Sequence, residues 1–299
     1  MRPRSRGVGV QPPTRPMVVA HRGASSGSAE HTLDAYVTAI ESGADALECD
    51  VRMTRDGHLV CVHDRTVNRT SDGRGVVSEL DLDGLKSLNF ASWHSDLPTS
   101  ADQLLSDTPY LAGIAPDRVE RGGGVLTLER LLQLVHDASR PVRMLVETKH
   151  PTRYQGLVEK ELVQLLARFG WAGAAPGPTP TARHPAELGN RAVVMSFAPT
   201  ALRRVKMLAP DVPTVLLLDR LLPRRRDGVL PVGVAIAGPS LHMLRAVPGY
   251  VARAHARGHR VFVWTVDEPD DVHYVLDLGV DTIITNRPDE VIRHLGAVG

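Results

Sequence analysis

Eight short apolar, β-branched segments recur along the chain, and the segments between them carry apolar residues three and four positions apart. The second pattern is typical of amphipathic helices. Alternating strands and helices predict parallel βαβ units, and eight such units predict an α/β fold with a single closed (β/α)8 TIM barrel. The predicted strands are 17–21, 45–51, 143–149, 192–197, 214–219, 233–238, 260–266 and 281–286.

A ninth apolar run, HLVCVHD at 58–64, follows the second predicted strand too closely to be another barrel strand. A parallel crossover needs a dozen or more residues, whereas only RMTRDG separates the two runs. That connection also contains Asp-Gly, a dipeptide that favours a hairpin turn. We therefore predict a β-hairpin over 52–64 that returns His63 to the neighbourhood of Glu48 and Asp50.

The length and composition of the chain fit one large domain with irregular additions. With 299 residues, 42% of them apolar, the chain can bury a substantial core, and we predict a single domain over 17–299. Residues 1–16 are basic and rich in Pro and Gly, which predicts a disordered leader. A segment rich in Pro, Asp and Gly, about 95–124, precedes the third strand and is predicted to be an insertion over the barrel mouth.

Charge and hydropathy exclude several classes of partner. Lys and Arg (35) nearly balance Asp and Glu (34), so no global basic field exists to hold nucleic acid or an acidic membrane. The leader lacks the apolar centre of a signal peptide, and no apolar run approaches the ~20 residues that span a bilayer. Cys49 and Cys61 give no disulfide framework, so we expect reduced thiols. These features predict a soluble, cytoplasmic protein without stable membrane association.

Charged and titratable side chains gather where the first three predicted strands end, the edge at which such barrels build active sites. Side chains alternate across a strand, so the two acidic residues of the second strand share a face, as do the Glu and Lys of the third. All can converge on the mouth together with the returning hairpin. The set is His21 and Arg22, Glu48 and Asp50, His63, and Glu147 and Lys149.

This set predicts metal-assisted phosphoester hydrolysis. Three carboxylates brought together raise one another's pKa values unless a cation sits between them. All-oxygen ligation suits Mg2+, Ca2+ or Mn2+ better than zinc, so Glu48, Asp50 and Glu147 are the candidate ligands of one divalent cation. With Arg22 and Lys149, that cation would form a positive cavity suited to a phosphate, and the two histidines could serve as general acid and base.

Each of these features alone has a simpler explanation. A Glu-x-Asp at a strand end is more often a salt-bridged or capping pair than a metal site, and a lone histidine is more often a core or loop residue. Arg22 could cap a helix, and Lys149 could pair only with Glu147. The joint placement of all these features at strand ends or on the returning hairpin favours a site over independent accidents.

A series of motifs resembles the glycerophosphodiester phosphodiesterase family, in order and spacing. The motifs are AHRGASSGSAEHTLDAY, GADALECDVRMTRDGHLVCVHD, TLERLL, LVETK, SF, VWTV and GVDTIITNRPD. The resemblance covers roughly 17–292 and implies a (β/α)8 barrel related to phosphatidylinositol phospholipases C. It implies an acid/base pair in His21 and His63, and phosphate contacts from Arg22 and Lys149. The three carboxylates would bind the divalent ion.

The resemblance also places Trp264 in the pocket for the alcohol or glycerol, whereas the sequence pattern alone predicts core packing for this residue. Two positions depart from the family's usual motifs: His31 replaces Asn in Glu-Asn-Thr, and Asp267 replaces the Asn after Trp-Thr-Val. Both bear on which alcohol is preferred.

The predicted function is metal-dependent hydrolysis of small glycerophosphodiesters to glycerol 3-phosphate and an alcohol. One alternative is a lysophospholipase D-like enzyme, which would need an apolar groove for an acyl chain, for example from DTPYLAGI at 107–114. An alternative of another class is a non-catalytic barrel that binds phosphorylated metabolites. That alternative expects a candidate ligand or histidine to be missing, and none is.

Overall fold

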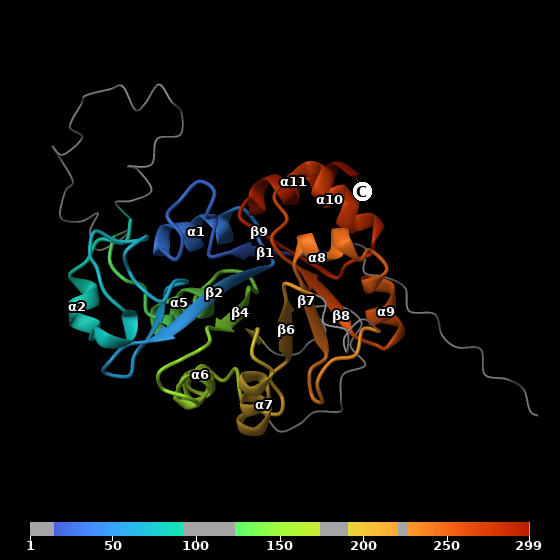
Figure 1. The fold of residues 1–299 in the computed structure, drawn as a ribbon. Coiled ribbons are helices and arrows are strands. Elements are labelled where there is room, and N and C mark those ends of the chain that lie inside the picture. Colours follow the sequence, from blue (N-terminus) through green and yellow to red (C-terminus); the bar gives the residue numbers. More distant parts are fainter. Residues whose placement is uncertain (1–14, 92–122, 174–190, 221–226, 299) are drawn as a thin grey trace, which may run out of the picture.

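Eight parallel strands close into a barrel, as predicted, in the computed structural model, which describes residues 15–91, 123–173, 191–220 and 227–298 (Figure 1). Strand β1 (Met17–His21) pairs with β2 (Ala46–Met53) on one side and with β9 (Thr282–Thr285) on the other, which closes the ring. The remaining barrel strands are β4 (Arg143–Thr148), β5 (Ala192–Ser196), β6 (Thr214–Leu218), β7 (Ile236–Pro239) and β8 (Arg260–Val263).

The ninth strand forms the predicted hairpin. Strand β3 (Leu59–Cys61) runs antiparallel to the end of β2, with Cys61 opposite Val51. In the turn, Gly57 has a φ of 91° and donates its N–H to the carbonyl of Thr54. Glycine adopts this left-handed conformation without steric cost, which explains why the chain reverses here. The hairpin extends β2 beyond the barrel rim and brings the following residues back over it.

Helices follow most of the strands and lie around the outside of the barrel (Figure 1). The Thr32 and Thr127 hydroxyls cap helix N-termini by accepting the N–H groups of Ala35 and Arg130. Pro248 separates two short helices after β7. The helices are α1 (Leu33–Glu41), α2 (Leu82–Lys86), α5 (Leu128–His136), α6 (Leu157–Arg168), α7 (Pro199–Leu208), α8 (Leu241–Ala246), α9 (Tyr250–Ala256), α10 (Pro269–Asp277) and α11 (Pro288–Val298), with a 3-10 turn at Val77–Glu79.

The strands separate an apolar interior from larger apolar layers beneath the helices. On β2, Ala46 belongs to the interior cluster, whereas Leu47 and Cys49 pack outward with residues of the surrounding helices. Side chains alternate along a strand, so Glu48 and Asp50 face the interior, above its apolar floor. The predicted parity of this strand is therefore confirmed, and it sets the position of the candidate site.

Several predictions concern other parts of the chain. Cys49 and Cys61 are free and buried, as expected. Within the described ranges, no helix has both the length and the apolar character needed to cross a membrane. The leader at 1–16 falls almost entirely outside the described residues, as does most of the predicted insertion at 95–124, including the proposed acyl-chain segment 107–114.

Candidate active site

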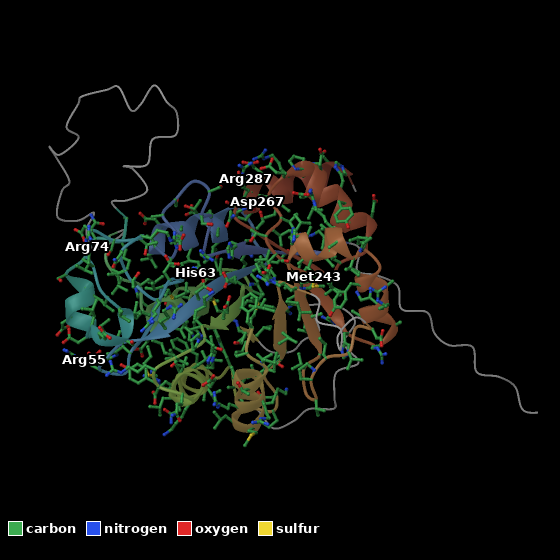
Figure 2. All side chains as sticks on the ribbon, viewed as in Figure 1. Arg55, His63, Arg74, Met243, Asp267 and Arg287 are labelled. Carbon is green, nitrogen blue, oxygen red and sulfur yellow. The ribbon has the colours of Figure 1, made fainter. Side chains whose placement is uncertain are left out.

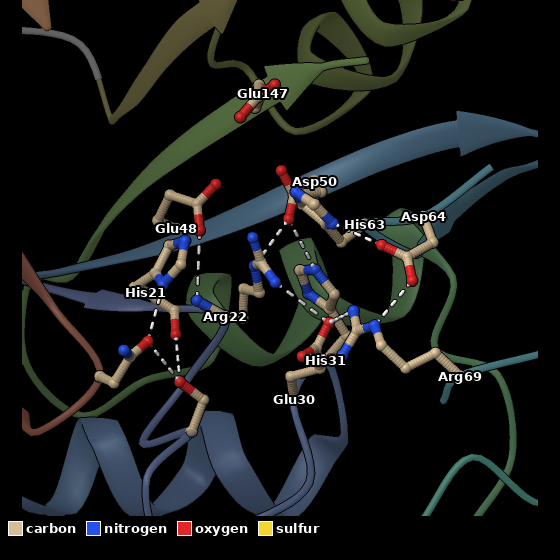
Figure 3. A network of polar contacts seen from close by, with 12 residues as sticks. His21, Arg22, Glu30, His31, Glu48, Asp50, His63, Asp64, Arg69 and Glu147 are labelled. Carbon is tan, nitrogen blue, oxygen red and sulfur yellow. Dashed lines mark hydrogen bonds and ion pairs between the residues drawn. The ribbon is translucent and has the colours of Figure 1, made fainter. Parts of the chain in front are cut away.

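The ends of β1, β2 and β4 lie side by side, and their registers bring the predicted site residues together. His21 pairs in register with Glu48, and Asp50 pairs with Glu147. Figure 3 shows Glu48 and Asp50 along one strand and Glu147 on the strand beside it. Parallel pairing thus places one histidine and three carboxylates at a single edge of the barrel, as the sequence predicted.

The three carboxylates Glu48, Asp50 and Glu147 are buried, and a ligand oxygen from each lies within 4.8 Å of the others. Burial and the charge of Asp50 raise the pKa of Glu147 to about 8, and the same two causes raise the pKa of Glu48 well above its usual value. The pKa of Asp50 is lowered despite burial, by a hydrogen bond from His31 and by nearby cations. A divalent cation would relieve this mutual repulsion, so the triad fits a hard metal ion.

Two cationic side chains surround Asp50. The Arg22 Nε lies 2.9 Å from Asp50 Oδ2, and the Lys149 Nζ lies 3.0 Å from Asp50 Oδ1 and 2.9 Å from Glu147 Oε1. The Arg22 backbone N–H also donates to the Glu48 carboxylate over 3.2 Å. Only 16% of the Arg22 side chain and 10% of that of Lys149 are exposed, so solvent screens these charges little.

The loop after β1 is shaped by its backbone. Arg22 and Gly23 both have positive φ, 59° and 88°. A Cβ at Gly23 would lie 2.7 Å from the backbone carbon of Ala35, closer than real Cβ atoms approach. Glycine at this position therefore lets the loop pass against α1 and turn Arg22 back toward β2.

His21 is held by a relay of hydrogen bonds that runs through Asn286, at the end of the last barrel strand, to Asp267. Its Nδ1 lies 2.7 Å from the Asn286 Oδ1, and the Asp267 carboxylate accepts both the backbone N–H and the side-chain amide of Asn286. An amide oxygen only accepts, so Nδ1 carries the proton and Nε2 keeps its lone pair. Burial, followed by the charge of Arg22, lowers the pKa of His21 to about 4. The ring is neutral at pH 7 and can accept a proton at Nε2.

His63 returns on the hairpin and belongs to a second relay, drawn with dashed lines in Figure 3. Its Nδ1 lies 2.7 Å from Asp64, whose other oxygen accepts from the Arg69 Nε over 2.6 Å. Arg69 also binds Glu30 through two hydrogen bonds of 2.8 and 2.9 Å, and Glu30 accepts from the Arg22 Nη1 over 3.2 Å. Burial lowers the pKa of His63, although Asp50 and Asp64 oppose it. The relay therefore links the orientation of His63 to that of Arg22.

A cavity of about 510 Å³ joins these groups to an apolar wall. The Trp264 indole N–H donates to the carbonyl of Gly238, and its ring meets Phe197 edge to face, with centroids 5.6 Å apart. Trp264 packs on the interior core, as the pattern predicted, and it also lines the cavity. Its contact with an alcohol or glycerol group stays a prediction. The polar lining is His21, Arg22, Glu48, His63, Glu147, Lys149 and Asp219, and the apolar remainder is Met195, Phe197, Leu217, Trp264 and Ile284.

Sequence reasoning missed several partners of the site. Asn286 follows the last strand, so the search for polar side chains at strand ends could have found it. Glu30 and Arg69 lie in loops far apart in sequence, and no periodicity marks their pairing. His31 was noted only as a departure from the motif, yet it is buried and bonds Asp50.

The contacts of His31 connect two of the candidate ligands. Its Nε2 lies 3.1 Å from Asp50 Oδ2, and its Nδ1 lies 2.8 Å from the Tyr36 hydroxyl. That hydroxyl donates to the backbone carbonyl of Glu48 over 3.0 Å. The larger ring at this position thus braces the side chain of one carboxylate and the backbone of another.

Comparisons with known proteins show which family the chain resembles. A model of the "Glycerophosphoryl diester phosphodiesterase family" matches residues 21–290. The Mycobacterium tuberculosis protein "Probable glycerophosphodiester phosphodiesterase 1" is 43% identical over 273 residues, 91% of this chain and 90% of that protein. A Bacillus subtilis glycerophosphodiester phosphodiesterase is 32% identical over 285 residues, which cover 93% and 85% of the two chains.

A solved structure shares the fold. It is that of an Oleispira antarctica phosphodiesterase in complex with the product sn-glycerol-3-phosphate, and it superposes with a TM-score of 0.72 at 19% identity. The match covers 94% of this chain and 97% of the other.

Proposed function

Since the chain belongs to the glycerophosphoryl diester phosphodiesterase family and is a phosphoric diester hydrolase with glycerophosphodiester phosphodiesterase activity, we propose a substrate class and a cofactor for it. The substrates are small, soluble glycerophosphodiesters, which it converts to glycerol 3-phosphate and an alcohol with the help of one divalent cation. The observation that carries this proposal is one cavity lined by two histidines, two cationic side chains and the carboxylates Glu48 and Glu147, with Asp50 completing the carboxylate triad beside it. The product bound by the Oleispira antarctica relative supports glycerol 3-phosphate as a product here.

Glu48, Asp50 and Glu147 would hold the cation, which we propose to be Mg2+ or Ca2+, with Mn2+ meeting the same preference for oxygen ligands. When bound, the cation would supply positive charge that stabilises the phosphate as negative charge develops on its oxygens. Arg22 and Lys149, already beside the carboxylates, would bind the same phosphate from the protein side.

His21 is proposed as the general base. Its Nδ1 proton is held by Asn286, so Nε2 is the nitrogen that can take a proton from the nucleophile. The nucleophile is water or the glycerol hydroxyl of the substrate, and attack by the hydroxyl would pass through a cyclic phosphate. The pKa of about 4 supports this role because it keeps the ring unprotonated at neutral pH.

His63 is proposed as the general acid that protonates the departing alkoxide. Asp64 accepts from its Nδ1, so Nε2 is left for the leaving group. Burial lowers the pKa of this histidine, while the carboxylates nearby and the negative charge of a bound phosphodiester favour its protonated form. The hairpin position supports the assignment because the histidine stands above the mouth, where an alcohol could leave.

Trp264 and Phe197 are proposed to contact the carbon skeleton of the substrate, because they form the apolar side of the cavity opposite the charged groups. We further propose a cytoplasmic location, which the two free, buried thiols support because thiols stay reduced in that compartment.

The direct test is a panel of glycerophosphodiesters assayed with and without a chelator, with glycerol 3-phosphate as the readout. We expect release of glycerol 3-phosphate that stops on chelation and returns with Mg2+ or Ca2+. Detergent-dispersed lysophospholipids belong in the same panel, and faster turnover of these would replace the proposal with the lysophospholipase D-like alternative. Full activity after exhaustive chelation would contradict the metal.

A further inference from the structure

A second cavity, also of about 510 Å³, lies beside the candidate active site, and Lys149 lines both cavities. It is formed by the end of β2, the segment around the 3-10 turn and the loop between β4 and α6. The Tyr154 hydroxyl donates to the carbonyl of Ser78 over 2.8 Å, which joins two of these walls. The cavity volume lies in the range of small-molecule sites, ~300–1,000 Å³.

Three arginines line this second cavity: Arg52, Arg65 and Arg153. Among the described residues, no carboxylate oxygen lies within 4.0 Å of their guanidinium nitrogens. Arg55 and Arg69, on neighbouring loops, both have carboxylate partners. Because the three cavity arginines lack such partners, the second cavity carries an excess of positive charge in a nearly neutral protein.

The carboxylates near this cavity offset its positive charge only in part. Glu79 is the single acidic residue in the lining, and it is exposed. His150, also in the lining, is already matched by Glu159, whose Oε1 lies 2.9 Å from its Nε2. Neither carboxylate lies within ion-pairing distance of the three arginines, so neither competes with an anion for them.

Arg52 connects the second cavity to the candidate active site. It shares strand parity with Glu48 and Asp50, and its Nε and Nη2 donate to the backbone carbonyl of His63 over 3.1 and 2.8 Å. Arg52 is half-buried, and among the described residues no carboxylate pairs with it. An anion bound in the second cavity would sit just beyond the histidine proposed to protonate the leaving group.

We propose that the second cavity is an anion subsite for the alcohol part of the substrate. The preferred substrates are then glycerophosphodiesters whose alcohol carries a negative group of its own, a phosphate or a carboxylate. The reacting phosphate lies at Lys149 on one side, and the second anion meets Arg65 and Arg153 on the other. This inference rests on the proposed function, because it names the substrates of that same site.

The test compares matched substrate pairs that differ by one anionic group. Glycerophosphoglycerol is paired with its terminal phosphate ester, and glycerophosphoethanolamine with glycerophosphoserine, so that the two pairs separate phosphate from carboxylate recognition. We expect kcat/KM to be about tenfold higher for the anionic member of at least one pair, the factor that one charge-assisted hydrogen bond supplies. The preference should shrink as ionic strength rises.

Variants assign the preference to the cavity. Arg65→Ala and Arg153→Ala should each reduce the ratio of kcat/KM for anionic over neutral substrate several-fold, and the double variant should bring it to about one. Arg65→Lys and Arg153→Lys keep the charge and should retain part of the preference. Arg74→Ala is the matched control, because this exposed arginine lies on the same segment but outside the cavity, at the edge of the molecule in Figure 2. It should leave the ratio unchanged.

Two results would overturn the subsite. One is equal kcat/KM for both members of both pairs, and the other is a preference that survives in the double variant, which would mean that the charge is recognised elsewhere. Either result leaves the proposed function intact, since neutral glycerophosphodiesters would still be hydrolysed. Failure to hydrolyse any of the four substrates would instead contradict the proposed function itself.

Discussion

The two halves of the barrel mouth differ in chemistry although the same backbone builds both. At the ends of β1, β2 and β4 the inward positions carry His21, Glu48, Asp50 and Glu147, each held by a charged or polar partner. At the ends of β5, β6 and β8 most equivalent positions carry apolar side chains, namely Met195, Phe197, Leu217 and Trp264. One half is suited to reaction and the other to contact with carbon.

The charged half can remain buried because its charges are paired. Buried carboxylates are costly unless they are paired or bound to metal, and here every one has a cationic or hydrogen-bonding neighbour. The apolar half has no such requirement, and Phe197 can stay 45% exposed. We therefore expect substitutions in the charged half to lower kcat and those in the apolar half mainly to raise KM.

The largest effect should come from the carboxylates. Glu48→Gln removes one charge of the candidate metal site, so metal affinity and activity should fall together, with kcat/KM down by about 10³-fold at low metal concentration. High Mg2+ or Ca2+ should partly restore it. Metal affinity can be measured without turnover, from the rise in thermal midpoint with added ion.

The matched control for the carboxylate variant is Glu41→Gln, at the exposed end of α1, which should change neither metal affinity nor activity. Loss of activity in Glu48→Gln with unchanged metal affinity would mean that Glu48 acts on substrate rather than on metal.

The next effect separates the two histidines. An alkoxide leaves poorly unless protonated, whereas a nitrophenolate leaves as the anion. His63→Ala should therefore lose ~10²- to 10³-fold on a glycerophospho-alcohol and keep most activity on a nitrophenyl phosphodiester. His21→Ala should lose both activities. If His21→Ala is the variant spared on the activated substrate, the two roles are reversed.

A smaller effect concerns the relay behind His21. The base must be neutral, so activity is lost as pH falls through the pKa of His21, which burial and Arg22 hold at about 4. At saturating metal, the acid limb of kcat/KM should lie near pH 4 rather than at the ordinary histidine value. Asn286→Ala should lower kcat about tenfold by freeing the ring, without moving this limb upward, because the lost hydrogen bond had favoured protonation. An acid limb near pH 6.5 in the wild-type protein would rule out His21 as the base.

These cases show which parts of the molecule follow from local pattern. Strand parity alone placed Glu48 and Asp50 on one face, and the Asp-Gly turn alone predicted the hairpin that returns His63. Both depend on spacing along a few residues, which the sequence displays directly. The barrel could be predicted for the same reason, because eight strand–helix alternations are all local signals.

The relays could not be predicted in this way. The partner of His21 is Asn286, 265 positions away, and their contact exists only because β1 and β9 close the ring. The pairing of Glu30 with Arg69 joins two loops whose paths depend on tertiary packing. The role of Trp264 could not be predicted from local pattern either. An aromatic residue on an interior strand face can pack in the core, line a cavity or do both, and only the folded structure shows which.

The smallest effect tests the apolar half. Phe197 stands at the end of β5, packs edge to face on Trp264 and is close to half exposed, so Phe197→Ala removes substrate contact with little loss of core. Contact with part of one phenyl ring is worth about 1 kcal/mol, which corresponds to roughly fivefold in KM, with kcat nearly unchanged. Met207→Ala is the control, because Met207 is 76% exposed on α7 and lines neither cavity. A fall in kcat without a change in KM would show that this wall orients the reacting phosphate, and the division between the two halves of the mouth would then be wrong.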